Sequence, residues 1–363
     1  MEKEAARVMS RAGIHYWKCD RPAAFHGTQW RGEPDKDLEP LLREELVDHF
    51  SVSRLVLSPG AGQGNHLTWK AEVDGTPMFI RVENGPENDD HLAVESLLLD
   101  RVRACGVPTP LVHGCDATRT RVPFAWQALE RIDAPDLNHW HKQGGLDVPR
   151  VAIEIGAAVA QWQTIGLPGF GVPDEDLRGY HQTYPAYFHL QLERHLAFLT
   201  EGGFLTAGES EAILAAIVAH ESLLHLGRGC LVHKDLALWN ILGTPERITA
   251  FIDFDDTISG DPMDDLSLLG CFHDAAFLGH ARAGYQSVSP LPPEHRRRFW
   301  LHLLRNMIVK AVIRVGAGYF DRDARFFLIG TGSTGAELKA FTHQRLNAAL
   351  RGLREDLDIE QGL

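Results

Sequence analysis

Residues 231–270 hold a dense set of side chains suited to catalysis, with histidine, asparagine and several aspartates placed between short apolar runs. Two of these runs flank the turn at residues 243–245 and predict a β-hairpin. Such a hairpin returns Asp253 to the side of Asn240, and two neighbouring oxygen ligands suit a hard cation. Asp235 lies in the loop before the hairpin, so we expect it beside the metal rather than on it.

A second group of candidates lies in the N-terminal half, where the apolar spacing is that of strands. Three strands are predicted, at residues 54–58, 66–73 and 78–82. The turn between the first two contains Gly60, Gly62 and Gly64, whose backbone N–H groups can approach a phosphate closely. A glycine-rich hairpin turn is also common without any ligand, so both interpretations stay open.

The third predicted strand carries a cation, Arg81, and the helix predicted over residues 89–105 carries Glu95. A pair between the two would hold the guanidinium toward a phosphate, whereas an ordinary surface glutamate is the plainer interpretation of Glu95. Residues 130–135 have the polarity and proline of an exposed connector. From residue 149 the apolar spacing becomes helical. The order of elements therefore predicts a small sheet lobe joined to a helical lobe.

The composition limits the kind of protein that contains these candidates. At 363 residues the chain is long for a single core, so two lobes are the default expectation. The formal net charge of −13 argues against a nucleic-acid-binding protein, which needs a basic face. The five cysteines are scattered without a CxxC pair, which argues against a zinc ribbon or a disulfide framework.

Neither a targeting segment nor a membrane span is predicted. The first residues mix charged and apolar side chains without a continuous hydrophobic run, so no signal peptide is expected. The apolar region at 299–319 is interrupted by Arg305, Lys310 and Arg314, which is typical of an amphipathic helix. We expect a cytoplasmic protein with no membrane partner, and the sequence predicts no particular oligomeric state.

Three segments resemble the signature loops of one family. Residues 233–240, HKDLALWN, resemble the loop HGDLHxxN of the aminoglycoside phosphotransferase and choline kinase-like small-molecule kinases, itself similar to the HRD loop of protein kinases. Residues 252–256, IDFDD, resemble the family's metal-binding segment, and residues 260–267, GDPMDDLS, resemble the stretch GDPxxDLA. The resemblance covers residues from about 54 to 270.

This resemblance implies an α+β fold of the bilobal, protein-kinase-like kind, with a small antiparallel-sheet N-lobe and a larger, mostly helical C-lobe. We divide the chain accordingly. Residues 1–50 would be a helical N-terminal extension, 51–131 the nucleotide-binding N-lobe, and 132–363 the C-lobe with the catalytic loop, the metal-binding loop and the acceptor site.

The resemblance also implies a role for each candidate. Asp235 would orient the acceptor hydroxyl or take its proton, His233 would brace the loop, and Asn240 and Asp253 would hold Mg²⁺ on the phosphates of ATP. The nucleotide-binding set would comprise the glycine turn, the strand cation with its helix partner, and the hinge: Gly60, Gly62, Gly64, Arg81, Glu95, Leu129 and Arg131. GTP is a possible donor as well, because a hinge reads the base largely through main-chain groups.

Two departures from the family pattern bear on these roles. Arg81 stands where kinases usually have a lysine, and its planar fork aligns differently on phosphates than a point charge does. Lys234 replaces the usual glycine of the catalytic loop and adds a cation beside Asp235, so we include it among the candidates for phosphate contact.

The acceptor is expected to be small. Protein kinases have a long activation segment after the metal-binding aspartate, whereas the Gly260-Asp261-Pro262 stretch follows Asp253 closely and leaves little room to dock a peptide. An aminoglycoside or other antibiotic, a sugar, an amino alcohol or a natural-product intermediate would all suit the fold. Acidic residues in the C-lobe would favour a cationic acceptor, although an acidic surface that keeps the protein soluble explains them equally well: Asp255, Asp256 and Asp264.

Two other functions remain open on the sequence. Arg81 and the irregular glycine turn are compatible with a pseudokinase that binds nucleotide without transferring phosphate, although the complete set of Asp235, Asn240 and Asp253 argues against it. A metal-dependent hydrolase would instead use His233, Asp235 and Asp253 as metal ligands.

Overall fold

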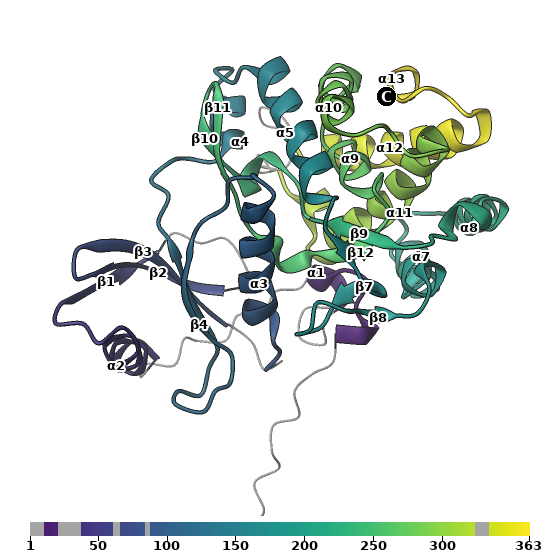
Figure 1. The fold of residues 1–363 in the computed structure, drawn as a ribbon. Coiled ribbons are helices and arrows are strands. Elements are labelled where there is room, and N and C mark those ends of the chain that lie inside the picture. The colour runs from purple at the N-terminus through teal and green to yellow at the C-terminus, as the bar shows by residue number, and fades with distance from the viewer. Residues whose placement is uncertain (1–10, 21–37, 61–65, 84–87, 324–333) are drawn as a thin grey trace, which may run out of the picture.

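The computed structural model describes residues 11–20, 38–60, 66–83, 88–323 and 334–363. Its smaller lobe contains a five-stranded antiparallel sheet with the strand order β1-β2-β3-β5-β4 (Figure 1). The strands are β1 (Leu55–Pro59), β2 (His66–Val73), β3 (Thr76–Glu83), β4 (Val112–Asp116) and β5 (Trp126–Glu130). The prediction of an antiparallel-sheet N-lobe is confirmed.

Two helices cover this sheet. Helix α2 (Leu38–Phe50) places Leu38, Leu42 and Leu46 in a buried cluster with strand residues that include Trp69 and Ile80. Helix α3 (His91–Ala104) packs on the strands through contacts such as the 2.9 Å hydrogen bond from Gln127 Nε2 to Ser96 Oγ. The apolar side of α3 belongs to the large cluster of the other lobe, so this helix connects the two cores.

The hairpin between β2 and β3 turns as its sequence predicts. Asp74 and Gly75 both have positive φ, 46° and 87°, which is the backbone that a two-residue hairpin loop of type I′ requires. The resulting register sets Thr68 of β2 opposite Arg81 of β3. Arg81 is thereby fixed on the strand that faces the other lobe.

The larger lobe is mostly helical and carries a second, irregular sheet with the order β6-β9-β12-β7-β8. Its strands are β6 (Gly166–Leu167), β7 (Phe170–Pro173), β8 (Gly179–His181), β9 (Gly229–Val232) and β12 (Ile258–Gly260), and a separate hairpin pairs β10 (Ile241–Thr244) with β11 (Arg247–Phe251). The helices before the hairpin are α4 (Leu137–Lys142), α5 (Val148–Trp162), α6 (Tyr184–Phe188), α7 (Leu192–Glu201) and α8 (Ala207–Ala219). Those after it are α9 (Asp264–Leu269), α10 (Ala275–Val288), α11 (His295–Gly316), α12 (Gly335–Glu355) and α13 (Ile359–Gly362).

Helices α5 and α10 pack backbone against backbone. A Cβ on Gly156 of α5 would lie 1.8 Å from the carbonyl oxygen of Ala281, and one on Gly284 of α10 would lie 2.0 Å from that of Ile153. Only glycine permits so close an approach. The close contact fixes the end of α5, where Trp162 Nε1 donates a 2.9 Å hydrogen bond to Asp265 beneath the catalytic loop.

Within the first fifty residues, the two described segments, 11–20 and 38–50, pack on different lobes. The turn of 3₁₀ helix at Arg11–Gly13 and helix α1 (Trp17–Asp20) lie against the larger lobe, and Tyr16 and Cys19 belong to its core (Figure 1). Helix α2, by contrast, packs on the sheet of the smaller lobe. The lobe boundary at residue 131 stays a prediction.

The helix expected around residues 299–319 is α11, but the expectation that it is amphipathic is wrong, because the helix is buried on all sides from Phe299 to Val312. Arg305, Lys310 and Arg314 are buried with it. Among the described residues, no helix combines the length and the apolar character that crossing a membrane requires. The cytoplasmic location stays a prediction.

Candidate active site

The β10–β11 hairpin brings the two expected metal ligands to one end. Ile241 pairs with Phe251, and the N–H of Ile252 donates a 3.0 Å hydrogen bond to the carbonyl oxygen of Asn240. Asn240 therefore precedes one strand at the point where Asp253 follows the other. The amide nitrogen of Asn240 donates to the Asp235 carbonyl oxygen at 2.8 Å, so its own side-chain oxygen is the atom left to ligate a cation.

Asp253 stands out by its backbone and its charge. It has a φ of 68°, a left-handed conformation that non-glycine residues seldom adopt. This bend ends the hairpin and directs the carboxylate toward Arg81, whose guanidinium lies 3.1 Å away. Burial and the neighbouring Asp255 raise the pKa of Asp253, although Arg81 opposes them. A carboxylate held under these conditions is stabilised by an added cation.

Arg81 is the centre of a buried ion cluster, which we call the Arg81 cluster. It pairs with Glu95, as predicted, and its second nitrogen lies 3.1 Å from Asp253 and 3.3 Å from Asp255. Glu95 is 1% exposed, so the interpretation of it as a surface glutamate is wrong. Burial raises the pKa of Glu95 to about 7 against the opposing effect of Arg81.

The same cluster ties the lobes together. The second carboxylate oxygen of Glu95 accepts a 3.1 Å hydrogen bond from the backbone N–H of Phe254, directly after Asp253. His66 of β2 contacts Arg81 at 2.9 Å, and His91 of α3 lies 3.5 Å from Asp255. The N-lobe cation is thus fixed on the C-lobe carboxylates.

Asp235 is the centre of a second cluster, which we call the Asp235 cluster. Its Oδ1 accepts hydrogen bonds from the Tyr16 hydroxyl at 2.7 Å and from Lys310 Nζ at 3.1 Å. Its Oδ2 accepts from Lys18 Nζ at 3.0 Å and from Asn240 Nδ2 at 3.1 Å. The Asp235 side chain is only 2% exposed.

These partners keep Asp235 ionised. Burial alone would raise the pKa of Asp235, but the ammonium groups of Lys18 and Lys310, with hydrogen bonds from Tyr16 and Lys18, outweigh it and hold the pKa well below its ordinary value. A carboxylate with so low a pKa is a weak base. Its chemistry is that of a hydrogen-bond acceptor that aligns a hydroxyl.

His233 braces the loop, in the position the resemblance implies. Its Nε2 lies 3.0 Å from the carbonyl oxygen of Ile252, and its Nδ1 accepts from the N–H of Asp235 at 3.3 Å. The ring packs against Phe254 with centroids 4.3 Å apart. Because both ring nitrogens are occupied by the backbone, His233 is not placed to ligate a metal.

Lys234 points away from the catalytic carboxylate. Its φ is 68°, the left-handed backbone that explains why related loops carry glycine at this position. Its ammonium group bonds Asp264 at 2.7 Å and Asn306 at 2.9 Å, and the residue is 3% exposed. In this arrangement Lys234 stabilises the loop from behind, and the expectation that it contacts phosphate has no support from the geometry.

Asp265 and Asp261 hold the backbone around residues 233–240. Asp265 accepts 3.1 Å hydrogen bonds from the N–H groups of both His233 and Lys234. Asp261 accepts from the N–H of Met263 at 2.8 Å and pairs with Arg298. Asp264 is likewise paired internally, so it is not available to a cationic acceptor.

The remaining nucleotide-binding candidates are placed in part. Gly60 ends β1, where its N–H bonds the carbonyl oxygen of Thr68 at 2.8 Å and a Cβ would lie 2.5 Å from the Thr68 hydroxyl. Gly62 and Gly64 lie outside the described residues. Leu129 is buried in β5, and the N–H of Arg131 bonds Pro77 across the sheet at 3.4 Å.

Three residues of the Asp235 cluster were missed by the sequence analysis: Tyr16, Lys18 and Lys310. Lys310 was noted only as a charge that interrupts an apolar helix. Tyr16 and Lys18 lie more than two hundred residues from Asp235 in the sequence, and their contact depends on how α1 docks. The run His15-Tyr16-Trp17, bulky side chains in an otherwise polar N-terminus, was the signal that this segment packs into a core.

A family model described as the phosphotransferase enzyme family, APH, matches residues 56–308, more than two thirds of the chain. The chain belongs to this family. The predicted resemblance is therefore confirmed, and so is the prediction of an enzyme of the small-molecule kinase class. No curated protein matches the phosphotransferase by sequence.

Solved structures with the same fold support this assignment at low sequence identity. Aminoglycoside phosphotransferase APH(4)-Ia, in a ternary complex with AMP-PNP and hygromycin B, is 16% identical, with a TM-score of 0.60 over 87% of this chain and 98% of that chain. A proposed fructosamine-3-kinase from Thermobifida fusca is 22% identical, with a TM-score of 0.56 over 82% of this chain and 94% of that chain. A proposed aminoglycoside phosphotransferase from Ralstonia eutropha is 17% identical, with a TM-score of 0.58 over 87% and 98%. These likenesses confirm the bilobal, kinase-like fold.

Proposed function

We propose that this phosphotransferase transfers the γ-phosphoryl group of ATP to a hydroxyl group of a small molecule, with Asp235 aligning that hydroxyl. The observation that carries the proposal is the hydrogen bond between Asn240 and Asp235 at the end of the β10–β11 hairpin, where Asp253 also lies. Phosphoryl transfer needs an aligning carboxylate next to metal ligands, and these three side chains supply that set.

Asn240 and Asp253 are the residues that would hold Mg²⁺. Both offer oxygen, the donor that Mg²⁺ prefers, and Asp253 and Asp255 both lie within 3.3 Å of the single guanidinium of Arg81, so an added cation would find more than one carboxylate there. When bound, the ion would neutralise charge on the phosphates. The donor set therefore fits the cation that the family resemblance implies.

The transfer itself requires little of the protein beyond alignment. The oxygen of the acceptor hydroxyl forms a bond to the γ-phosphorus, and the bond from that phosphorus to the bridging oxygen breaks, with its electron pair leaving on ADP. Asp235 accepts the hydrogen bond of the hydroxyl while the oxygen attacks. Because Asp235 is a weak base, the proton is released to solvent, giving a phosphate ester and ADP.

The nucleotide would lie between the lobes, under the turn that begins at Gly60 and beside Arg81 with its partner Glu95. Because the N–H of Arg131 already bonds Pro77, we expect adenine contacts to come from the connector after this residue. Such main-chain contacts would serve ATP and GTP alike. APH(4)-Ia has been solved with AMP-PNP and with ADP, which supports nucleotide binding by this fold.

The acceptor class is a hydroxyl-bearing small molecule. APH(4)-Ia has been solved with hygromycin B, and fructosamine kinases share the fold, so antibiotics, sugars, amino alcohols and natural-product intermediates are the compounds to test first. The stretch between Asp253 and β12 is too short for a peptide-docking segment, which supports a small acceptor over a protein.

The experiment is a screen of hydroxyl compounds scored by acceptor-dependent ADP release and by the mass gain of one phosphoryl group. Asp235→Asn is expected to remove the activity found, and Asp176→Asn, an exposed aspartate on the same lobe, is the matched control. ADP release that is unaffected by Asp235→Asn would contradict the proposal and favour a nucleotide-binding pseudokinase with background hydrolysis.

The metal-dependent hydrolase is the weaker alternative. It needs His233 as a ligand, and both nitrogens of that ring are bonded to the backbone. Stoichiometric zinc or manganese in the purified protein, found by elemental analysis, would be the result in its favour.

A further inference from the structure

A cation from outside the family's signature loops touches the aligning carboxylate. Lys18 Nζ bonds Asp235 Oδ2 at 3.0 Å, and Asn240 Nδ2 donates to the same oxygen at 3.1 Å. Tyr16 and Lys310 bond the other oxygen, Oδ1. Lys18 therefore lies on the Asn240 side of Asp235, where the metal ion and the phosphates belong under the proposed function.

The charges that act on Lys18 also indicate that it lies near the proposed metal site. Burial lowers the pKa of Lys18, but the carboxylates of Asp235, Asp256 and Asp253 raise it by more, so the ammonium group stays protonated. Asp253 is one of the two proposed metal ligands. Lys18 is thus within electrostatic reach of both the aligning carboxylate and the metal-binding carboxylate.

Lys18 has the freedom that a phosphate contact requires. An ammonium group has three N–H donors, and its bond to Asp235 uses one. The Lys18 side chain is 34% exposed, compared with 10% for Lys310, which also bonds the Tyr16 hydroxyl at 3.1 Å. Lys18 can therefore turn a donor toward a phosphoryl oxygen without leaving the site.

Arg81, the cation on strand β3, is poorly placed to contact the phosphoryl group in place of Lys18. The guanidinium of Arg81 is 7% exposed and is bonded to Glu95, Asp253 and Asp255. Three carboxylates compensate its single charge. At Asp235 the ratio is reversed, because two ammonium groups, those of Lys18 and Lys310, are in direct contact with one carboxylate.

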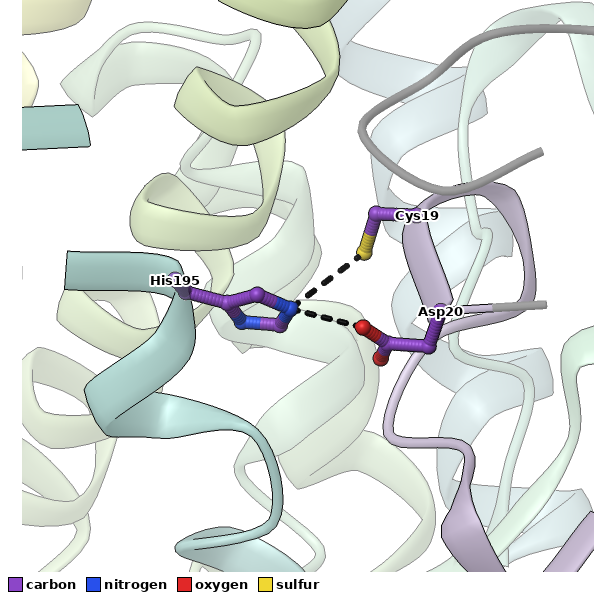
Figure 2. Close-up of side chains that lie close together, drawn as sticks. All are labelled: Cys19, Asp20 and His195. Atoms are coloured by element: carbon purple, nitrogen blue, oxygen red, sulfur yellow. Dashed lines mark hydrogen bonds and ion pairs between the residues drawn. The ribbon is translucent and has the colours of Figure 1, made fainter. Parts of the chain in front are cut away.

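Lys18 is held in place by the docking of its own helix. Figure 2 shows Cys19 and Asp20 facing His195 of α7, with Asp20 Oδ1 2.7 Å and Cys19 Sγ 3.8 Å from His195 Nε2. The other oxygen of Asp20 accepts from the N–H groups of His15 and Tyr16 at 3.1 and 2.9 Å.

These three side chains offer ligand-type atoms within 4.8 Å of one another, yet they are better explained as an anchor than as a metal site. Arg305 places its positive guanidinium 3.2 Å from the second nitrogen of His195, and Asp20 is already saturated with donors. The anchor fixes α1 on the larger lobe, and Lys18 extends from it toward Asp235.

We infer that Lys18 is a catalytic residue, delivered by the N-terminal segment, that donates to the phosphoryl group during its transfer. The inference rests on the proposed function. As the acceptor oxygen bonds the γ-phosphorus and the bond to ADP breaks, negative charge is carried by the transferred oxygens, and Lys18 compensates it without losing its proton. Its turn away from Asp235 also leaves a lone pair of Oδ2 to the acceptor hydroxyl.

The direct test is equilibrium binding of nucleotides, which needs no acceptor. Calorimetry would compare Mg-AMP-PNP with Mg-ADP in the wild type, in Lys18→Met and in the control Lys339→Met, which removes an exposed lysine on α12. Lys18→Met is expected to weaken AMP-PNP about tenfold while ADP binding, which lacks the γ-phosphate, is unchanged. Lys18→Arg should retain part of the affinity for AMP-PNP.

Equal weakening of both nucleotides, or no change in either, would overturn the role of Lys18 while leaving the proposed function intact. Failure of the wild type to bind either nucleotide would contradict both. With an acceptor in hand, Lys18→Met should lower kcat roughly 100-fold with little change in the KM for ATP.

The other source of negative charge at Lys18 is an anionic acceptor, and a matched series separates it from the phosphoryl group. Glucuronate, glucose and glucosamine share one hydroxyl framework and differ in charge. A Lys18→Met variant that changed the preference among these sugars, with AMP-PNP binding unaltered, would make Lys18 an acceptor-binding residue and overturn the inference.

Discussion

The two charged clusters of the active site are built in opposite proportions. The Arg81 cluster has one guanidinium among three carboxylates, those of Glu95, Asp253 and Asp255. The Asp235 cluster has one carboxylate in contact with two ammonium groups, those of Lys18 and Lys310. Among the direct contacts, carboxylates outnumber the cation in the first cluster, which suits an added cation, whereas ammonium groups outnumber the carboxylate in the second, which suits an added anion.

Under the proposed function, this difference would allow one site to assemble Mg²⁺, ATP and a hydroxyl. The proposed metal ligand Asp253 belongs to the Arg81 cluster, which suits an added cation. The proposed aligning carboxylate Asp235 belongs to the Asp235 cluster, which suits an added anion. Asn240 joins them, since its amide nitrogen bonds Asp235 and its oxygen is left for the metal. Substitutions that change one cluster at a time test the comparison.

The largest effect is expected from Asp235→Asn. Phosphoryl transfer should fall roughly 1,000-fold because the hydroxyl loses its aligning acceptor. The free energy of unfolding should fall by about 3–5 kcal/mol, because the buried ammonium of Lys310 and that of Lys18 lose their counter-charge. Urea denaturation measures the second quantity, with Asp176→Asn as the control. Unchanged stability would mean that the ammonium groups do not depend on Asp235.

Asp253→Asn should abolish transfer as well, but with the opposite effect on stability. The pKa of Asp253 is raised by burial and by Asp255, so its ionised form is unfavourable in the folded protein. A neutral amide removes that repulsion and can still accept from Arg81. We expect the free energy of unfolding to rise by about 0.5–1 kcal/mol, as at other active sites where function opposes stability. A fall in the free energy of unfolding as large as that expected for Asp235→Asn would contradict the proposed difference between the two clusters.

A smaller effect is expected from loosening the anchor of α1. Asp20→Asn weakens the buried hydrogen bond to His195, at a cost of about 1–3 kcal/mol in the free energy of unfolding. Because Lys18 is part of α1 and is displaced when the helix is, the same variant should reproduce part of the AMP-PNP binding defect of Lys18→Met. Calorimetry with AMP-PNP and ADP tests this. Normal AMP-PNP binding in a destabilised Asp20→Asn protein would separate the anchor from the site.

The smallest effect concerns pH. Burial, opposed by the hydrogen bond to Asp20, holds the pKa of His195 below its ordinary value of about 6.5, and Arg305 lowers it further. The unfolded chain therefore binds more protons as the pH falls below about 6.5, and stability present above that pH is lost by up to about 1.4 kcal/mol per pH unit. His195→Gln should make this slope shallower in urea denaturation across pH 5–8. An identical slope would show that His15 or another buried group is responsible.

The parts of the site that could be predicted from the sequence are those set by local geometry. Asp235, Asn240 and Asp253 lie within one loop and one hairpin, so the turn and its register were enough to bring them together. Arg81 and Glu95 were paired correctly, and they lie only 14 residues apart, on a strand and on the helix that follows it. Such contacts depend on short stretches of chain, where spacing carries the information.

The parts that could not be predicted depend on long-range docking. Lys18 reaches Asp235 only because α1 crosses to the larger lobe, and nothing in its immediate sequence specifies that path. Lys234 was expected on the phosphates, but its left-handed backbone turns the side chain to Asp264. The strands β7 and β12 were missed because three or four residues carry no readable alternation.

The measurement that tests the account most directly is calorimetric titration of AMP-PNP, with and without Mg²⁺, into the wild type, Asp253→Asn and Asp235→Asn. We expect Mg²⁺ to strengthen the binding of AMP-PNP to the wild type and to Asp235→Asn, and we expect Asp253→Asn to lose this dependence on Mg²⁺. If AMP-PNP binding to Asp253→Asn still depended on Mg²⁺, this would contradict the proposal that the Arg81 cluster accepts the cation and the Asp235 cluster accepts the anion.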